Sequence, residues 1–383
     1  MKRLGLGWVF VWLGCLAAQA VVPGSGNAGA YRALLAGKKV GLAANHTAVV
    51  GEMHTVDFLR GQGIEVVRLF CPEHGFRGDA DAGATVGNAT DPKTGLPVIS
   101  LYGKKKKPSP ADLQGIEVMV FDMQDVGVRF YTYLSTLHYV MEACAEQDIP
   151  LVVMDRPNPN AFYTDGPILE KQHASFVGMH PVPIVYGMTI GEYARMINGE
   201  GWLKGGIACR LTVVPCLGWR RNMTVRLPRK PSPNLPDSVS VMLYPSVCLF
   251  EGTVVSEGRG TETPFQVFGH PELKGMPYTF IPRSIPGMSA SPKCLGKTCH
   301  GEDLRGRYAE VKAGKRLRLE WLLEAYRRYE GEAPFFTGFF EKLAGTDRLR
   351  KAIEAGKSEE EIRAEWQPGL EAFKQKREKY LIY

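Results

Sequence analysis

Four short apolar segments, separated by stretches of helical periodicity, constrain the fold of this chain more than any other feature. They are residues 39–44 (KVGLAA), 64–70 (IEVVRLF), 117–123 (EVMVFDM) and 149–154 (IPLVVM). Helices are expected at 55–62, 131–147 and 189–202, and a fifth strand at 97–102. Largely apolar strands that alternate with helices predict a parallel sheet covered by helices on both faces. The expected fold is therefore a doubly wound α/β domain.

A second domain is expected because 383 residues exceed what one hydrophobic core usually organises. The α/β pattern occupies residues 28–205, and the composition changes after that point. Residues 206–383 contain an expected strand at 209–215, a Pro-rich stretch (LPRKPSPNLP) and an amphipathic helix at 317–329. A further strand is expected at 280–285. This half is predicted to form a smaller α+β domain.

The first twenty residues have the pattern of a signal peptide. A basic pair at 2–3 precedes an apolar run at 4–16, and Ala-Gln-Ala at 18–20 fits the small-x-small cleavage rule. We therefore expect an exported protein, periplasmic or secreted, with residues 1–20 removed. A lipid anchor on Cys15 is the alternative. No later segment is long and apolar enough to span a membrane.

The charge balance excludes some partners and permits others. The formal net charge is +7, of which two charges lie in the signal peptide, and this mild excess suits an anionic substrate. The dense basic run at 104–107 has no interleaved aromatic residues, so no nucleic-acid partner is expected. No G-x-G-x-x-G follows the first strand, so no nucleotide cofactor is expected, and no metal site is expected either.

Polar residues follow four of the expected strands. In open parallel sheets, ligands bind beyond the carboxyl ends of the strands, so these residues predict a cleft at that edge. The segments are Asn45-His46-Thr47, residues 72–79 (PEHGFRGD), residues 124–129 (QDVGVR) and residues 155–160 (DRPNPN). Asn45 and Asn158 are candidate substrate-binding residues on this basis.

Glu73 is the sharpest catalytic candidate. A carboxyl group directly after a buried strand is partly desolvated, and desolvation raises its pKa toward that of a proton donor. His74 and Arg77 could tune this acid or bind an anionic group. The alternative is an ion pair between Glu73 and Arg77 that only holds the loop.

Asp122 and Asp125 are the second set of carboxylate candidates. Both belong to the FDMQD segment at 121–125, and either could face Glu73. A buried carboxylate needs a partner, so the alternative is a structural role. Arg129, Tyr131 and Tyr133 follow, and they either bind a sugar ring or pack at a helix start.

The second half of the chain contains residues that we expect to line one side of a binding site for an anionic ligand. The candidates are Asn234, within PNLP, and Arg259 and Glu262, within GRGTETPF at 258–265. A surface loop would have a similar composition.

Six long motifs together resemble the NamZ-type exo-β-N-acetylmuramidases. They are GLAANHT (41–47), PEHGFRGDADAG (72–83), DPKTGLPVISLYG (91–103), FDMQDVGVRFYTY (121–133), MDRPNP (154–159) and FEGTVVSEGRGTETPF (250–265). The resemblance runs from about residue 30 to the C-terminus. It implies removal of N-acetylmuramic acid from the non-reducing ends of peptidoglycan fragments, that is, a saccharide of MurNAc-GlcNAc type as substrate. It also implies a Rossmann-like domain and a smaller second domain with the active site between them.

The glutamate of the family's EHG motif falls on Glu73, which the resemblance assigns as the acid. Asp122, Asp125 and Glu262 are candidates for the second group. Three arginines could bind the lactyl carboxylate of muramic acid: Arg77, Arg129 and Arg259. Two other functions stay open. One is a non-catalytic cell-wall sugar-binding protein with the same cleft, and the other is a metal-assisted hydrolase that uses His46, His74 and Asp79.

Overall fold

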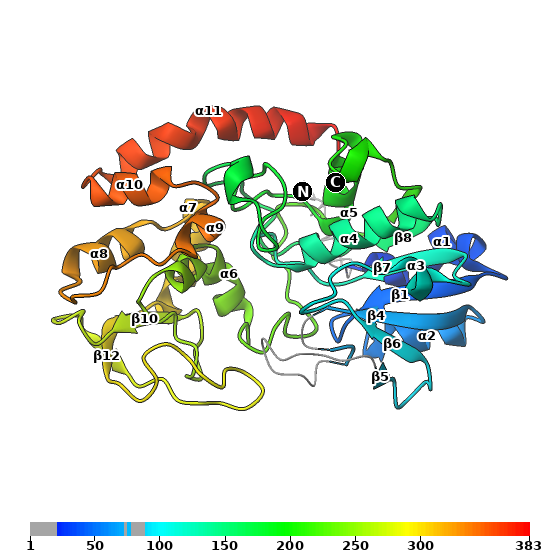
Figure 1. The fold of residues 1–383 in the computed structure, drawn as a ribbon, viewed down its shortest axis with the longest axis horizontal. Coiled ribbons are helices and arrows are strands. Elements are labelled where there is room, and N and C mark those ends of the chain that lie inside the picture. Colours follow the sequence, from blue (N-terminus) through cyan, green and yellow to red (C-terminus); the bar gives the residue numbers. More distant parts are fainter. Residues whose placement is uncertain (1–20, 73–74, 78–88) are drawn as a thin grey trace, which may run out of the picture.

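A computed structural model of the chain describes residues 21–72, 75–77 and 89–383. The expected signal peptide at 1–20 lies outside the described residues. Figure 1 shows two lobes, with the large sheet and its helices on the right and a second lobe on the left. The last long helix, α11 (Glu359–Glu378), runs along the top from the second lobe back toward the first.

The first lobe is built on a seven-stranded sheet, in which only the short β5 is antiparallel to its neighbour. Its strands are β1 (Lys39–Ala44), β4 (Glu65–Cys71), β5 (Ala89–Thr90), β6 (Pro97–Ser100), β7 (Val118–Asp122), β8 (Leu151–Met154) and β9 (Leu211–Val214). The order is β5-β6-β4-β1-β7-β8-β9. The chain thus fills one side of β1 and then crosses to fill the other, which confirms the doubly wound α/β fold.

Helices cover both faces of this sheet because its strands are apolar on both sides. Val118 and Val120 of β7 join one core together with α1 (Ala28–Leu35) and α2 (Thr55–Gly61). Met119 and Phe121 point to the opposite face, into the core that contains α4 (Tyr133–Glu146) and α5 (Ile190–Gly199). This alternation is the two-residue period of a strand. A short α3 (Pro110–Leu113) precedes β7.

Local side-chain chemistry explains where α5 begins. Thr189 accepts a hydrogen bond from the backbone N–H of Glu192, and the Glu192 carboxylate accepts one from the backbone N–H of Thr189. This capping box satisfies two amides that would otherwise lack partners, as the sequence predicted.

The strand expected at 209–215 belongs to the first lobe. β9 pairs in parallel with β8, as in Val153 opposite Val213, and forms the edge of the seven-stranded sheet. The sheet therefore continues past residue 205, where the change in composition had suggested that the first domain ends.

The second lobe contains a three-stranded antiparallel sheet with the order β10-β12-β11. Its strands are β10 (Val267–His270), β11 (Tyr278–Phe280) and β12 (Cys299–Asp303). Its helices are α6 (Ser238–Val247), α7 (Tyr308–Gly314), α8 (Glu320–Arg328), α9 (Phe340–Ala344) and α10 (Arg348–Glu354). This smaller α+β unit confirms the expected fold class, and α8 confirms the amphipathic helix. The strand expected at 280–285 is wrong beyond Phe280, because Pro282 and Pro286 have no N–H for a ladder.

The two lobes share one hydrophobic core, which runs from α4 and α5 into α6, α8 and α9. A small hairpin, β2 (Val49–Val50) and β3 (Met53–His54), lies on the first lobe. Across the described part of the chain, every helix is too short or too polar to cross a membrane.

Candidate active site

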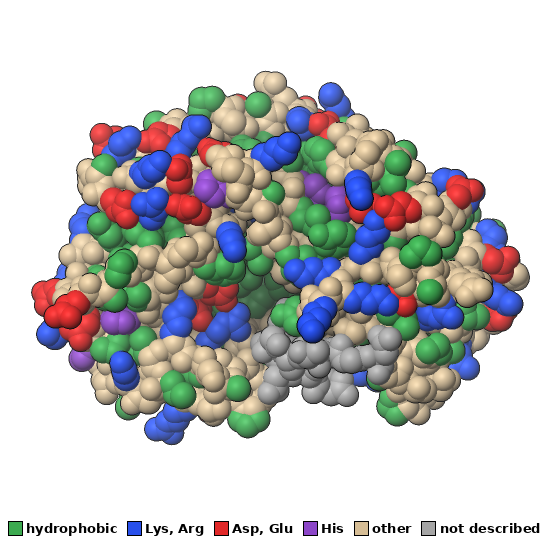
Figure 2. All heavy atoms as spheres, viewed as in Figure 1, with side chains coloured by type: hydrophobic (Ala, Val, Ile, Leu, Met, Phe, Trp, Pro, Cys, Tyr) green, Lys and Arg blue, Asp and Glu red, His purple; other side chains and the backbone are tan. Residues whose placement is uncertain are grey.

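The four polar segments predicted to form a cleft do follow neighbouring strands, because β4, β1, β7 and β8 are adjacent in the sheet. Parallel strands end at the same edge, so these loops lie side by side. Glu73 and His74 lie outside the described residues, as do 78–88, and Pro72 is the last described residue before the EHG motif. Figure 2 shows a hollow between the lobes, with apolar side chains in its depth and basic side chains around it.

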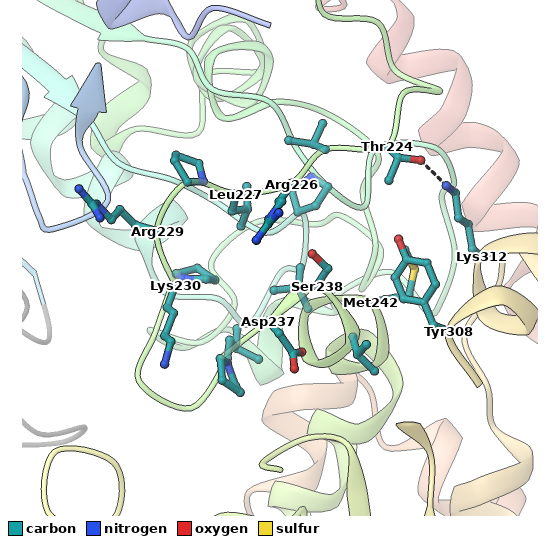
Figure 3. A pocket seen from close by; sticks show the side chains of 18 of the residues that line it. Thr224, Arg226, Leu227, Arg229, Lys230, Asp237, Ser238, Met242, Tyr308 and Lys312 are labelled. Atoms are coloured by element: carbon teal, nitrogen blue, oxygen red, sulfur yellow. Dashed lines mark hydrogen bonds between the residues drawn. The ribbon is translucent and has the colours of Figure 1, made fainter. Parts of the chain in front are cut away.

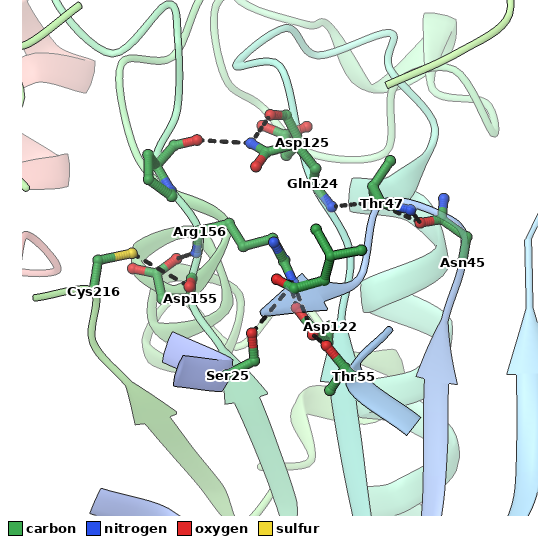
Figure 4. A network of polar contacts seen from close by, with 12 residues as sticks. Ser25, Asn45, Thr47, Thr55, Asp122, Gln124, Asp125, Asp155, Arg156 and Cys216 are labelled. Carbon is green, nitrogen blue, oxygen red and sulfur yellow. Dashed lines mark hydrogen bonds and ion pairs between the residues drawn. The ribbon is translucent and has the colours of Figure 1, made fainter. Parts of the chain in front are cut away.

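A buried polar network holds the ends of β1, β7 and β8 together (Figure 4). Asn45 Oδ1 accepts hydrogen bonds from Thr47 N at 3.0 Å and from Thr47 Oγ1 at 2.5 Å. Gln124 N donates to Thr47 Oγ1 at 3.0 Å, and Gln124 Nε2 donates to the carbonyl of Pro157 at 2.7 Å. Asn45 is therefore an organising residue of the edge, and its Nδ2 has no hydrogen-bond partner among the described residues.

Asp122 is fully buried, and both of its carboxylate oxygens are occupied. Arg156 Nε lies 2.5 Å from Oδ1 and Arg156 Nη2 lies 2.9 Å from Oδ2, while Thr55 Oγ1 donates to Oδ2 at 2.6 Å. A carboxylate bound by a guanidinium and a hydroxyl has little freedom to attack or to take a proton. This geometry favours the structural role that the sequence left open for Asp122.

Asp125 is also buried but is only partly satisfied. Its Oδ2 accepts hydrogen bonds from Gly127 N at 2.7 Å and from the Tyr186 hydroxyl, and its Oδ1 has no partner among the described residues. Burial raises the pKa of Asp125 to about 6, although both hydrogen bonds favour its charged form. A carboxyl group with a raised pKa and an unused oxygen at a strand edge has the properties of an acid–base or orienting group.

Arg129 is buried and bound to backbone carbonyls instead of to an acid. Its Nη1 donates to Pro167 O at 2.9 Å and Val182 O at 2.6 Å, and its Nη2 donates to Leu343 O and Ala344 O at 2.9 and 2.7 Å. Burial lowers the pKa of Arg129 to about 9. The guanidinium thus joins the first lobe to the C-terminal end of α9, and its terminal nitrogens are occupied.

Tyr131 and Tyr133 both point at the segment that leads into the second lobe. The hydroxyl of Tyr131 donates to the carbonyl of Pro231 at 2.6 Å, and that of Tyr133 lies 3.5 Å from the same oxygen. The two rings are buried and meet edge to face with centroids 4.8 Å apart. In this geometry they hold the backbone at Pro231 against the strand edge.

The two other asparagine candidates are buried and make backbone contacts. Asn158 Nδ2 donates to Met188 O at 2.7 Å, and Asn158 Oδ1 accepts from Asn160 N at 2.8 Å. Asn234 Nδ2 donates to Met288 O at 2.8 Å, whereas its Oδ1 has no partner in the described part of the chain. Asn234 therefore keeps an unused acceptor, and Asn158 does not.

Arg77 forms a two-pronged ion pair with Asp91. Arg77 Nε lies 2.6 Å from Asp91 Oδ1, and Arg77 Nη2 lies 2.8 Å from Asp91 Oδ2. A second acid, Asp57, places its Oδ2 3.6 Å from Arg77 Nη1. The hydrogen bond from Arg77 lowers the pKa of Asp91 to about 2. The guanidinium is thus occupied on one edge.

Arg259 lies between two glutamates of its own lobe. Its Nη2 is 2.6 Å from Glu251 Oε1, its Nε is 3.3 Å from Glu257 Oε1, and its guanidinium stacks 5.0 Å from the centroid of Phe265. Glu262 is exposed nearby in sequence. All three arginines expected to bind a lactyl carboxylate therefore already contact other groups of the protein.

Sequence reasoning missed Arg156 and Tyr186, the partners of Asp122 and Asp125. Arg156 stood in a predicted loop, and Tyr186 lies 61 residues from Asp125, with no motif to connect them. For the metal alternative, His46 Nε2 lies 2.8 Å from the carbonyl of Lys230. His74 and Asp79, its other two proposed ligands, lie outside the described residues.

Together, the fold and the site define a class: a two-domain α/β protein with buried carboxyl groups at the carboxyl edge of its sheet, facing a second lobe. The sequence models of the N-terminal and C-terminal domains of the exo-β-N-acetylmuramidase NamZ match residues 40–239 and 242–383. The chain therefore belongs to the NamZ family of glycoside hydrolases, which confirms the resemblance.

Individual relatives agree with this assignment. The peptidoglycan β-N-acetylmuramidase NamZ of Bacillus subtilis (strain 168) is 43% identical over 375 residues, which cover 92% of this chain and 89% of that protein. Two crystal structures of DUF1343 family proteins from Bacteroides fragilis NCTC 9343 cover 95% of this chain and 99% of their own. Their TM-scores are 0.88 and 0.78, at 46% and 29% identity.

Proposed function

We propose that this chain removes N-acetylmuramic acid hydrolytically from the non-reducing ends of peptidoglycan fragments, as an exo-acting glycoside hydrolase. The observation that carries the proposal is the match of both NamZ domains across residues 40–383. The activity named for the Bacillus subtilis relative supports the same substrate class. The released sugar would be available for wall recycling.

The acid in this proposal is Glu73, which protonates the departing glycosidic oxygen. Asp125 is the second group, because it alone of the three other candidate carboxylates is both buried and incompletely bound. Asp122 is held by Arg156, and Glu262 is exposed. With a pKa of about 6, Asp125 is mostly ionised at neutral pH, so it can activate a water molecule or orient the acetamido group of the substrate.

The proposal also includes export. Residues 1–20 would direct export of the chain across the cytoplasmic membrane, so that it acts in the periplasm or outside the cell, where its substrate is. Mass spectrometry of the mature N-terminus tests this. A start at Val21 supports cleavage after Ala20, whereas a lipid-modified Cys15 at the N-terminus supports the anchored form.

Release of a chromogenic aglycone from a β-N-acetylmuramide tests the reaction. We expect turnover of the muramide by the mature protein, no turnover of the matching N-acetylglucosaminide, and a loss of at least about 100-fold in Glu73→Gln. Asp125→Asn should lose turnover as well, while Glu262→Gln should retain it.

The same assay separates the alternatives. Saturable binding of muramic-acid sugars by a folded wild type that shows no turnover would replace the hydrolase proposal with the wall-sugar-binding protein. Turnover that a chelator abolishes would instead support the metal-assisted mechanism.

A further inference from the structure

A cavity of about 480 Å³ lies beside the strand edge, on the far side of the segment that Tyr131 and Tyr133 hold. Its walls are residues 222–231, the start of α6 and two side chains of α7, with Pro159 and Phe162 from the loop after β8 (Figure 3). This volume is within the range of small-ligand sites. The cavity therefore joins elements of both lobes at a place that none of the predicted site residues lines.

Positive charge in this cavity is largely uncompensated. Arg226 and Lys230 have no ion pair and no side-chain hydrogen bond with any described residue, and the Lys312 ammonium donates to the hydroxyl of Thr224. Asp237 is the one acid among the described residues of the lining. At the start of α6, its Oδ1 accepts from Ser240 N at 2.8 Å and its Oδ2 accepts from Gln266 Nε2 at 3.2 Å, so each oxygen keeps one further acceptor position. The described lining thus has four basic residues, of which only Arg229 is ion-paired, and one carboxylate; Arg226 and Lys230 are exposed, and this excess of positive charge favours an anionic ligand.

The lining is more than a basic patch, because it combines donors, an acceptor and apolar surface. Figure 3 shows Arg226 and Asp237 directed toward the cavity from different walls, and Arg229 directed away from it. Apolar walls come from Phe162 and Met242, among others. Asp237 repels a compact dianion such as phosphate, yet it can accept a hydrogen bond from an amide N–H. These features fit a carboxylate carried on a body that contains amide groups.

One segment connects this cavity to the strand edge. The carbonyl of Lys230 contacts His46 at 2.8 Å and the carbonyl of Pro231 accepts from Tyr131 at 2.6 Å, so their backbone faces the edge. The side chain of Lys230 lines the cavity. A ligand that extends past this segment can therefore contact both places.

We propose that this cavity binds a carboxylate of the wall fragment that lies outside the sugar removed by the enzyme. The identification of the ligand as part of a wall fragment rests on the proposed function. The existence of an anion-binding site rests only on the shape and charge of the cavity. Two parts of a wall fragment carry a carboxylate near an amide: the lactyl group of a further muramic acid and a short acidic peptide attached to one. The Arg226 guanidinium forms paired hydrogen bonds with the carboxylate, and Asp237 accepts from the amide.

Calorimetric titration of the full mature protein tests this binding without any need for turnover. The probes are an N-acetylated alanyl-glutamate dipeptide, N-acetylmuramic acid, inorganic phosphate, and the same dipeptide with its carboxylates amidated. Arg226→Gln is compared with Arg229→Gln. Arg229 is a matched control because, although it belongs to the lining segment, its exposed side chain points away from the cavity (Figure 3) and its Nη2 pairs with Glu52 at 2.7 Å.

We expect the dipeptide, the muramic acid or both to bind, the amidated dipeptide to bind poorly, and Arg226→Gln to weaken binding roughly tenfold or more. If the lactyl group is the ligand, muramic acid should show two binding events in the wild type and one in Arg226→Gln, because the cleavage site binds it as well. Dipeptide binding that depends on Arg226, with a single muramic-acid event that does not, identifies the peptide as the source. A muramic-acid event that depends on Arg226, without dipeptide binding, identifies the lactyl group.

Three results would overturn the proposal: no Arg226-dependent binding of either carboxylate probe, tighter binding of phosphate than of both, or equal weakening by Arg229→Gln. Failure of the proposed function would look different. In that case the muramide is not hydrolysed, while dipeptide binding and its dependence on Arg226 persist.

Discussion

Replacing Asp122 by asparagine distinguishes a structural carboxylate from a catalytic one. The side chains of Asp122 and Arg156 are almost completely buried, and two contacts of 2.5 and 2.9 Å join them. Removal of one partner leaves a guanidinium in the core without its counter-charge, and such losses cost about 3–5 kcal/mol. The hydrogen bond from Thr55 at 2.6 Å can survive in the amide. We therefore expect Asp122→Asn to lower the free energy of unfolding by about 3–5 kcal/mol.

Urea denaturation measures this loss, and turnover of the chromogenic muramide is measured in parallel, far below the unfolding transition. Asp148→Asn is the matched control, because Asp148 pairs with Arg210 at 2.9 Å but its side chain is 84% exposed. An exposed pair of this kind contributes at most about 1 kcal/mol. Asp122→Leu combined with Arg156→Met should recover most of the stability, since it leaves no unpaired charge.

The opposite pattern would refute this reasoning. If Asp122→Asn lost less than about 1 kcal/mol of stability yet lost more than about 100-fold in turnover, Asp122 would be a catalytic group. The buried ion pair with Arg156 would then be a feature of the resting site alone.

Three further predictions concern two buried side chains and one partly exposed thiol. Asp125 has a folded-state pKa of about 6, above its unfolded value, so the wild type loses stability as the pH rises through 4 to 6. Relative to the wild type, Asp125→Asn should therefore gain up to about 3 kcal/mol in the free energy of unfolding between pH 4 and pH 7, as measured by urea denaturation. A difference between the two proteins that does not change with pH would contradict this. Arg129→Met removes the hydrogen-bond donor of four backbone carbonyls and should lower the free energy of unfolding by roughly 3 kcal/mol, again by urea denaturation. A loss below about 1 kcal/mol would show that water replaces the guanidinium. A hydrogen bond from Cys299 lowers the pKa of the partly exposed Cys294 thiol, while burial raises that of Cys209 to about 12. Iodoacetamide at pH 7 should therefore alkylate Cys294 before Cys209, as measured by peptide mass mapping, and prior labelling of Cys209 would contradict this order.

The elements of the first lobe could be predicted because their signals are local. Each apolar strand carries its own preference for burial, and Thr189 and Glu192 cap α5 within four residues of each other. The alternation of strand and helix then implies a parallel sheet whose carboxyl ends share one edge. The placement of Asn45 and Asp125 at that edge follows from the same reasoning.

The limits of local reasoning appear at the domain boundary and in the choice of ionic partners. β9 follows a change in composition, yet it completes the first sheet because β8 offers an unpaired edge. Arg129 has the residue type of a carboxylate-binding group, but burial against four carbonyls gives it another role. The sequence shows which charged residues are present, but it does not show which of them form ion pairs in the folded protein.

The sequence by itself determined the fold class and the family, and it predicted the edge of the sheet as the place of the chemistry, because apolar periodicity and contiguous motifs are properties of neighbouring residues. Only the tertiary structure decided that Arg156 neutralises Asp122, that Tyr186 contacts Asp125, and that Arg226 lines a cavity with no acid partner in the described part of the chain. These pairings depend on side chains up to 61 residues apart, brought together by the packing of both lobes, and their energies depend on burial.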